Sequence, residues 1–240
     1  MRHCVALLLS GGTGIRLGAD IPKQYIRTGG RMMITRSLHA LFLCSQIEAV
    51  QIVADVARHK EIEEDWNSMC DIAGDWESIL GFSAPGENRQ MSILNGLMDI
   101  AGHYPEDTVV LIHDAARPFV SVELLENCIN ACVNHDGAMP VLPMKDTIYY
   151  SDNGSTITQL LDRECIYAGQ APEAFVLGKY LAANRALLPE QILTIKGSTE
   201  PAVMAGLDIV MFPGEESNFK VTTRADLERY ETIVMNGDKV

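Results

Sequence analysis

A continuous apolar run, Val5–Leu9, stops at the glycine-rich segment Ser10-Gly11-Gly12-Thr13-Gly14. An uninterrupted apolar strand is typical of a parallel sheet that is covered on both faces. Glycine lets the chain turn sharply after such a strand and lets backbone N–H groups approach a ligand, where they can hold phosphate oxygens. Two cations, Arg16 and Lys23, follow and could neutralise charge on a phosphoryl group. The segment predicts a first strand and a phosphate-binding loop.

The glycine loop matches neither of the two common phosphate-binding patterns. The P-loop pattern G-x-x-x-x-G-K-[S/T] is absent, and the spacing of G-x-G-x-x-G fails. A tight turn with two solvated cations explains these residues equally well, so the loop alone leaves both interpretations open.

Further along the chain, apolar runs alternate with segments of helical spacing. Strands are expected at Ala49–Val53, Thr108–His113 and Gly137–Leu142, and helices at Arg31–Cys44, Lys60–Met69, Met91–Ala101, Val122–Val133 and Arg224–Val234. This alternation predicts an α/β fold, a single Rossmann-like three-layer domain over residues 1–240 with a mostly parallel sheet. In such a sheet, ligands bind at the carboxyl ends of the strands.

The pattern changes in the segment DTIYYSDNGSTITQLL, where β-branched residues alternate on either side of Asp152-Asn153-Gly154. Asn-Gly between such runs is a strong hairpin signal. Two strands alone are marginally stable. We therefore expect a protruding hairpin arm at about residues 146–162 that packs on its own core or on a second subunit.

The charge balance narrows the class of ligand. The 240 residues carry a formal net charge of −13, which argues against general nucleic-acid binding. A small anionic substrate needs only a local positive cluster. No apolar run reaches the roughly 18 residues of a membrane span, and the first apolar run lacks a signal-peptide cleavage pattern. We expect a cytoplasmic protein that binds neither nucleic acid nor membrane.

The six cysteines include no C-x-x-C pair. Cys128 and Cys132 lie four residues apart on one face of a predicted helix, where small core residues are more common than metal ligands. No metal site built by the protein is therefore expected.

Two more segments carry candidate ligand-binding residues. Gly86, Arg89 and Ser92 lie at the start of a predicted helix, where free N–H groups favour an anion, although Ser92 could equally be the helix N-cap. Asp114 follows a strand at its carboxyl end, where ligands bind in α/β sheets. It could hold a ribose hydroxyl, lie near a magnesium ion, or pair with Arg117 or the backbone.

Taken together, these segments resemble in order and spacing the cytidylyltransferases that join CTP to a polyol phosphate. The resemblance covers nearly the whole chain: the glycine loop with its two cations, PKQY, the segment 86–92, HDAARP, a K-D-T-I segment before the hairpin, GQ-x-P and N-x-K-V-T. The two best-known branches of this family act on 2-C-methyl-D-erythritol 4-phosphate and on D-ribitol 5-phosphate. The first branch is favoured by the segments HDAARP and PKQY. The second branch is favoured by the segments K-D-T-I-Y, Y-x-G-Q-x-P and SN-x-K-x-T-T.

The resemblance implies a role for each candidate residue. It assigns the triphosphate to Ser10, Gly11, Gly12, Gly14, Arg16 and Lys23, the cytidine to Gly86, Arg89, Ser92 and Asp114, and the incoming phosphate to Arg163 and Lys220. It also implies magnesium carried by the CTP phosphates, and a homodimer whose hairpin arm reaches the partner's site, so that Arg163 acts in trans. The acceptor phosphate would attack the α-phosphorus of CTP and release pyrophosphate.

Three residues depart from the family pattern. Ala171 stands where the family has Thr in GQTPQ, Glu173 stands where it has Gln, and Glu200 lies in the segment that would face the polyol. These changes would alter recognition of the acceptor. Methylerythritol phosphate is the expected acceptor because its branch is the commoner among bacteria, and ribitol phosphate is the alternative. Two further alternatives remain. One is an enzyme that transfers another nucleotide, from UTP or ATP, to a sugar phosphate, and the other is a catalytically silent paralogue that binds CTP.

Overall fold

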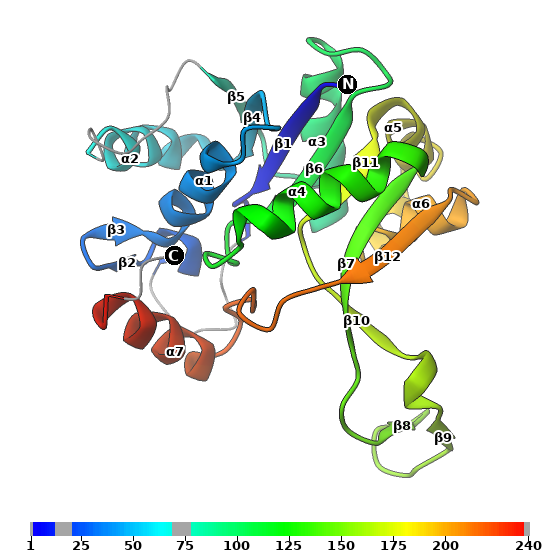
Figure 1. Ribbon diagram of the computed structural model, residues 1–240. Coiled ribbons are helices and arrows are strands. Elements are labelled where there is room, and N and C mark those ends of the chain that lie inside the picture. Colours follow the sequence, from blue (N-terminus) through cyan, green and yellow to red (C-terminus); the bar gives the residue numbers. More distant parts are fainter. Residues whose placement is uncertain (1, 13–20, 69–77, 238–240) are drawn as a thin grey trace.

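The computed structural model describes residues 2–12, 21–68 and 78–237, and its centre is one eight-stranded sheet (Figure 1). The strands of this sheet are β1 (Cys4–Leu9), β4 (Ala49–Val53), β5 (Ile79–Ser83), β6 (Val109–Asp114), β7 (Gly137–Pro143), β10 (Tyr167–Gly169), β11 (Glu173–Val176) and β12 (Ile209–Pro213). Their order is β10-β7-β11-β6-β1-β4-β5, and β12 pairs with β7 outside this path. β1 lies parallel to β4 and β6, β4 to β5, and β12 to β7, whereas β10 and β11 run antiparallel to their neighbours.

Helices cover both faces of the sheet (Figure 1). They are α1 (Met33–Leu43), α2 (Val56–Asn67), α3 (Arg89–Ala101), α4 (Val122–Ala131), α5 (Leu177–Arg185), α6 (Glu200–Met204) and α7 (Arg224–Met235). Alternate residues of β1 belong to different cores: Ala6 and Leu8 pack with α1 and α4, and Val5 and Leu7 pack with α3 and α5. This three-layer arrangement explains why β1 reads as an unbroken apolar run. The prediction of a single α/β domain with a mostly parallel sheet is confirmed.

Three helices begin elsewhere than their apolar spacing predicts, and one of them, α3, starts two residues earlier than expected. Arg31–Met32 form the short strand β3, which pairs with β2 (Arg27–Thr28), so α1 starts two residues later than expected. The turn between these strands uses Gly29 and Gly30, whose φ angles of 60° and 82° favour glycine. α2 starts four residues earlier than expected, because the side chain of Asp55 accepts a hydrogen bond from the N–H of Ala57 and caps the helix.

A separate two-stranded antiparallel sheet projects from the body of the molecule (Figure 1). It consists of β8 (Ile148–Tyr150) and β9 (Gln159–Leu161), with Tyr150 opposite Gln159. The connection is an eight-residue loop, 151–158, rather than a two-residue Asn-Gly turn. The side-chain oxygen of Asn153 accepts hydrogen bonds from the N–H groups of Ser155 and Thr156 and so orders this loop.

Large apolar side chains on this projection are exposed, namely Tyr149, Tyr150, Ile157 and Leu160. An exposed apolar cluster of this kind is typical of a surface that contacts another molecule. None of the helices in the described residues is both long enough and apolar enough to cross a bilayer.

Candidate active site

The glycine loop is held at the carboxyl end of β1 by residues of the PKQY segment. Gln24 donates its side-chain Nε2 to the carbonyl oxygens of Ser10 and Gly12, at 2.6 Å in each case. The hydroxyl of Tyr25 donates to the same Ser10 carbonyl at 2.9 Å. Ser10 is buried and donates both its N–H and its Oγ to the carbonyl of Val53. The course of residues 10–12 is therefore fixed from two sides. The individual roles of Gln24 and Tyr25 were not predicted from the sequence.

The glycine loop lies directly against the start of the segment that contains Gly86, Arg89 and Ser92. A Cβ added to Gly11 would lie 2.8 Å from Cβ of Pro85, and one added to Gly86 would collide with Met91. Both positions therefore require glycine for close approach of the chain. The structure thus brings Gly11, Gly12 and Gly86 together at one edge of the sheet, whereas Gly14 and Arg16 lie outside the described residues.

The first turn of α3 is organised by Asn88 and Ser92. The side chain of Asn88 accepts a hydrogen bond from the N–H of Met91 at 2.8 Å and is the N-cap of the helix. The N-cap interpretation of Ser92 is therefore wrong. Its hydroxyl instead accepts from the N–H of Gly86 at 2.9 Å and donates to the carbonyl of Asn88 at 3.0 Å. Ser92 thus fixes the turn that leads into the helix.

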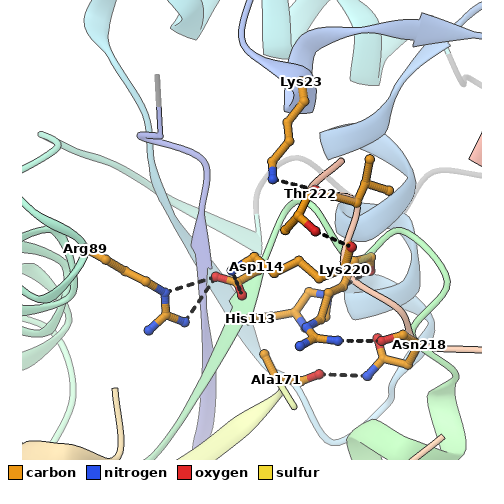
Figure 2. A network of polar contacts seen from close by, with 10 residues as sticks. Lys23, Arg89, His113, Asp114, Ala171, Asn218, Lys220 and Thr222 are labelled. Atoms are coloured by element: carbon orange, nitrogen blue, oxygen red, sulfur yellow. Dashed lines mark hydrogen bonds and ion pairs between the residues drawn. The ribbon is translucent and has the colours of Figure 1, made fainter. Parts of the chain in front are cut away.

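Asp114 is the centre of a cluster of charges at the end of β6 (Figure 2). Its Oδ1 accepts hydrogen bonds from Nε and Nη2 of Arg89 at 3.2 and 3.1 Å, and its Oδ2 accepts from Nζ of Lys220 at 2.8 Å. Burial works to raise the pKa of the Asp114 carboxyl, but Arg89 and Lys220 outweigh it and hold this pKa well below its usual range. Three candidates from distant parts of the chain therefore meet here.

The alternative pairing of Asp114 with the side chain of Arg117 is not formed. The guanidinium of Arg117 donates from Nη1 to the backbone carbonyl of Asn218 at 2.6 Å. His113, next in the chain to Asp114, is fully buried, and its Nε2 donates to the carbonyl of Arg117 at 3.1 Å. Burial lowers the pKa of His113 to about 4, so the ring is neutral at pH 7. His113 is therefore a buried residue that packs and makes a hydrogen bond, not a charged member of the cluster.

Lys23 approaches the same cluster from another side (Figure 2). Its Nζ donates to the backbone carbonyl of Val221, the residue after Lys220. Lys23 therefore contacts the backbone of the residue that follows Lys220, and the next residue, Gln24, holds the glycine loop.

Arg163 lies in an exposed turn that follows the projecting hairpin, where its Nη1 donates to the carbonyl of Lys145 at 3.0 Å. This is a different part of the chain from the elements that carry Lys23, Arg89 and Lys220.

The family model described as IspD, 2-C-methyl-D-erythritol 4-phosphate cytidylyltransferase, matches residues 4–236. The chain belongs to the IspD family. The resemblance to the cytidylyltransferases is thus confirmed, and the IspD family is a family of nucleotidyltransferases.

Curated relatives of the IspD family match along the whole chain. A 2-C-methyl-D-erythritol 4-phosphate cytidylyltransferase of Rubrobacter xylanophilus is 35% identical over 98% of this chain and 96% of its own length. One of Geobacillus kaustophilus is 32% identical over 95% of this chain and 96% of its own. The bifunctional enzyme IspD/IspF of Paramagnetospirillum magneticum is 33% identical over 95% of this chain and 56% of its own length. The chain therefore spans about half the length of such bifunctional relatives.

A solved structure supports the fold independently. The 4-diphosphocytidyl-2C-methyl-D-erythritol synthase of Anaerococcus prevotii superposes with a TM-score of 0.80 at 22% identity, covering 98% of this chain and 96% of that one. At this identity the likeness concerns the fold alone.

The departures from the IspD pattern differ in their surroundings. Glu200 is exposed, and its Oε2 accepts hydrogen bonds from the N–H groups of Lys196 and Gly197, so it stabilises its own turn. Glu173 is buried, and its Oε2 has no hydrogen-bond partner among the described residues. Burial raises the pKa of the Glu173 carboxyl, although the charge of Arg89 works in the opposite direction. Of these two carboxyl groups, Glu173 is therefore the one that interacts with the charges of Arg89 and Asp114.

Proposed function

We propose that this chain is a CTP-dependent 2-C-methyl-D-erythritol 4-phosphate cytidylyltransferase that supplies isoprenoid biosynthesis. The observation that carries the proposal is the meeting of Arg89, Asp114 and Lys220, with Lys23 beside them, next to the glycine loop of an IspD-family chain. Cations fixed around one carboxylate form a charged site that is preorganised for phosphates. Because CTP is a cytoplasmic nucleotide, we also place the protein in the cytoplasm.

In this proposal each group of residues holds one part of the substrates. The glycine loop, Lys23 and Arg16 bind the triphosphate, and the turn at Gly86–Ser92 with Asp114 receives the cytidine. Lys220 and Arg163 hold the phosphate of the acceptor. The ion pairs of Asp114 keep Arg89 and Lys220 extended toward the site, which reduces the ordering that substrate binding would require.

The proposed reaction needs no general base. A phosphate monoester has a second pKa of about 6, so it is largely dianionic at neutral pH. One of its oxygens attacks the α-phosphorus of CTP, a new P–O bond forms to the acceptor phosphate, and the bond to the β-phosphate breaks with release of pyrophosphate. The protein contributes positioning and stabilisation of the charge on the phosphoryl oxygens.

Magnesium is implied by this chemistry, but the described residues do not build a site for it. They contain no group of three or more His, Cys, Asp or Glu side chains that could hold a metal ion. Both carboxylate oxygens of Asp114 already accept hydrogen bonds from cations. We therefore propose that magnesium binds through the oxygens of the nucleotide, where it would neutralise phosphate charge.

The assay that tests the function is pyrophosphate release with CTP and magnesium. We expect release with methylerythritol phosphate, and parallel reactions contain ribitol phosphate and other polyol or sugar phosphates. UTP and ATP replace CTP in a second series. Release with ribitol phosphate alone would reassign the acceptor, and release with UTP or ATP alone would reassign the nucleotide. CTP binding without release for any acceptor would identify a catalytically silent paralogue.

We further propose that two chains form a homodimer through the projecting hairpin and that Arg163 acts in the partner's site. The exposed cluster on the hairpin and the place of Arg163 in the exposed turn beside it support this arrangement. In it, Lys23→Ala and Arg163→Ala subunits are each inactive alone. Random mixing gives heterodimers in half of the population, each with one intact site, so about a quarter of wild-type activity should return.

Mixed dimers are prepared by co-expression with two different tags, and their formation is verified before activity is measured. Wild-type subunits carrying the same two tags are the control. No recovery in verified heterodimers would place Arg163 in the site of its own subunit.

A further inference from the structure

The loop that carries Lys220 has little regular structure of its own. Residues 214–222, here called the Lys220 loop, connect β12 to α7 and contain neither helix nor strand. A lysine on such a loop is positioned only as well as the loop is fixed. We propose that Gln170 and Asn218 are positioning residues that fix the Lys220 loop for transfer to the acceptor phosphate. This inference rests on the proposed function.

Gln170 binds the start of the loop as a neighbouring strand would. Its Nε2 donates to the carbonyl of Glu215 at 2.9 Å, and its Oε1 accepts from the N–H of Glu215 at 3.1 Å. This is the double exchange seen between paired residues of antiparallel strands, made here by a side-chain amide. The side chain is buried. A Cβ on Gly214 would collide with Oε1 of Gln170, so glycine at this position permits the close approach.

Asn218 fixes the middle of the loop. It is fully buried, and its Nδ2 donates to the carbonyl of Ala171 at 2.7 Å (Figure 2). The backbone carbonyl of Asn218 accepts a hydrogen bond from Nη1 of Arg117 at 2.6 Å. Two consecutive residues, Gln170 and Ala171, therefore hold the loop at two points three residues apart.

Lys220 follows directly after this tethered part. Its Nζ reaches Asp114 at 2.8 Å, and the next residue, Val221, donates its N–H to the carbonyl of Ala116 at 2.9 Å. Lysine has a long, flexible side chain with many rotamers. Tethers on both sides of Lys220 therefore decide where its ammonium group can reach, and a displacement of about 1 Å at a reacting site can cost about 100-fold in rate.

The test is the variant Gln170→Ala. We expect kcat to fall about 10- to 100-fold and KM for the acceptor to rise, while Kd for CTP stays within about twofold of wild type. Added to Lys220→Ala, the same substitution should cause no further loss, because Gln170 acts through Lys220. Gln170→Glu keeps an acceptor for the N–H of Glu215 but sets a buried carboxylate oxygen against the Glu215 carbonyl, so it should not restore kcat above that of Gln170→Ala.

A second readout does not depend on activity. Hydrogen exchange of the backbone amides of residues 214–222, followed by mass spectrometry, should be faster in Gln170→Ala than in wild type, with exchange in β1 and β6 unchanged. Ser217→Ala is the matched control, because Ser217 lies exposed in the same loop and its Oγ contacts only Glu215 within that loop. It should match wild type in both readouts.

The outcomes separate this inference from the proposed function. Unchanged exchange in Gln170→Ala overturns the positioning role whatever the activity. A loss that adds fully to that of Lys220→Ala also overturns it, because it would mean that Gln170 acts independently. Wild-type protein without pyrophosphate release, or full activity in Lys220→Ala, would instead refute the proposed function while the exchange result still tests the tether.

Discussion

Replacing Lys23 by alanine is expected to lower kcat about 1,000-fold or more, with a much smaller change in KM for CTP. A cation that stabilises transferring phosphoryl oxygens contributes about 10³- to 10⁵-fold to kcat in comparable reactions. Gln24 and Tyr25 bind the carbonyls of Ser10 and Gly12, so the backbone at residue 23 stays in place when its side chain is removed. The measurement is the steady-state rate of pyrophosphate release at saturating CTP and acceptor.

Lys60→Ala serves as the matched control for this prediction. Lys60 lies exposed on α2, where its ammonium pairs with Glu64 at 3.4 Å, and its loss should leave kcat within twofold. Lys23→Arg keeps the charge but changes its geometry and should recover part of the rate. A kcat for Lys23→Ala close to that of wild type would mean that this lysine does not stabilise the transition state.

The apolar pattern located the buried strands well, because burial on both faces removes polar residues from a strand. The predicted runs Val5–Leu9 and Ala49–Val53 correspond to β1 and β4 to within one residue. The strand β12 could not be placed in this way, because it lies at an edge of the sheet with its side chains half-buried or exposed. Nor could α6, which at five residues is too short to show helical spacing.

Charged candidates could be found from motifs, but their partners could not. For Asp114 the sequence offered Arg117, three residues away, because local contacts are the ones that a linear sequence reveals. The carboxylate instead binds Arg89 and Lys220, which lie 25 and 106 residues away along the chain. Such pairs depend on which strands become neighbours, and this is a property of the folded sheet rather than of any one segment.

The second large effect is expected for stability. Asp114→Asn removes the carboxylate that Arg89 and Lys220 share and leaves their charges without a partner of opposite sign in that place. Breaking a buried ion pair costs about 3–5 kcal/mol, and about 3 kcal/mol applies here because Arg89 and Lys220 keep 34% and 32% of their side-chain surface exposed. For a chain of 240 residues this corresponds to a fall in Tm of about 6–12 °C at pH 7.

The pH dependence of this difference follows from the direction of the pKa shift. Because Arg89 and Lys220 hold the pKa of Asp114 in the folded protein below its ordinary value of 3.8, the carboxylate stabilises the fold fully above that pH. This contribution is lost progressively as the pH falls further toward the pKa of the folded state. The difference in Tm between wild type and Asp114→Asn should therefore be constant from pH 6 to 8 and should shrink below about pH 4.

Thermal unfolding at pH 7, 5 and 3 measures both parts of this prediction. Asp152→Asn is the control, because Asp152 is an exposed aspartate of the hairpin loop whose Oδ2 accepts a hydrogen bond from Thr158, and its Tm should stay within about 1 °C of wild type. Equal Tm values for wild type and Asp114→Asn at pH 7 would show that the fold tolerates the charges of Arg89 and Lys220 without the Asp114 carboxylate. At pH 3 part of the stabilisation by the Asp114 carboxylate is lost. A Tm difference that persists unchanged at that pH would therefore mean that the introduced amide disturbs packing, and that the loss of the carboxylate charge is not the cause.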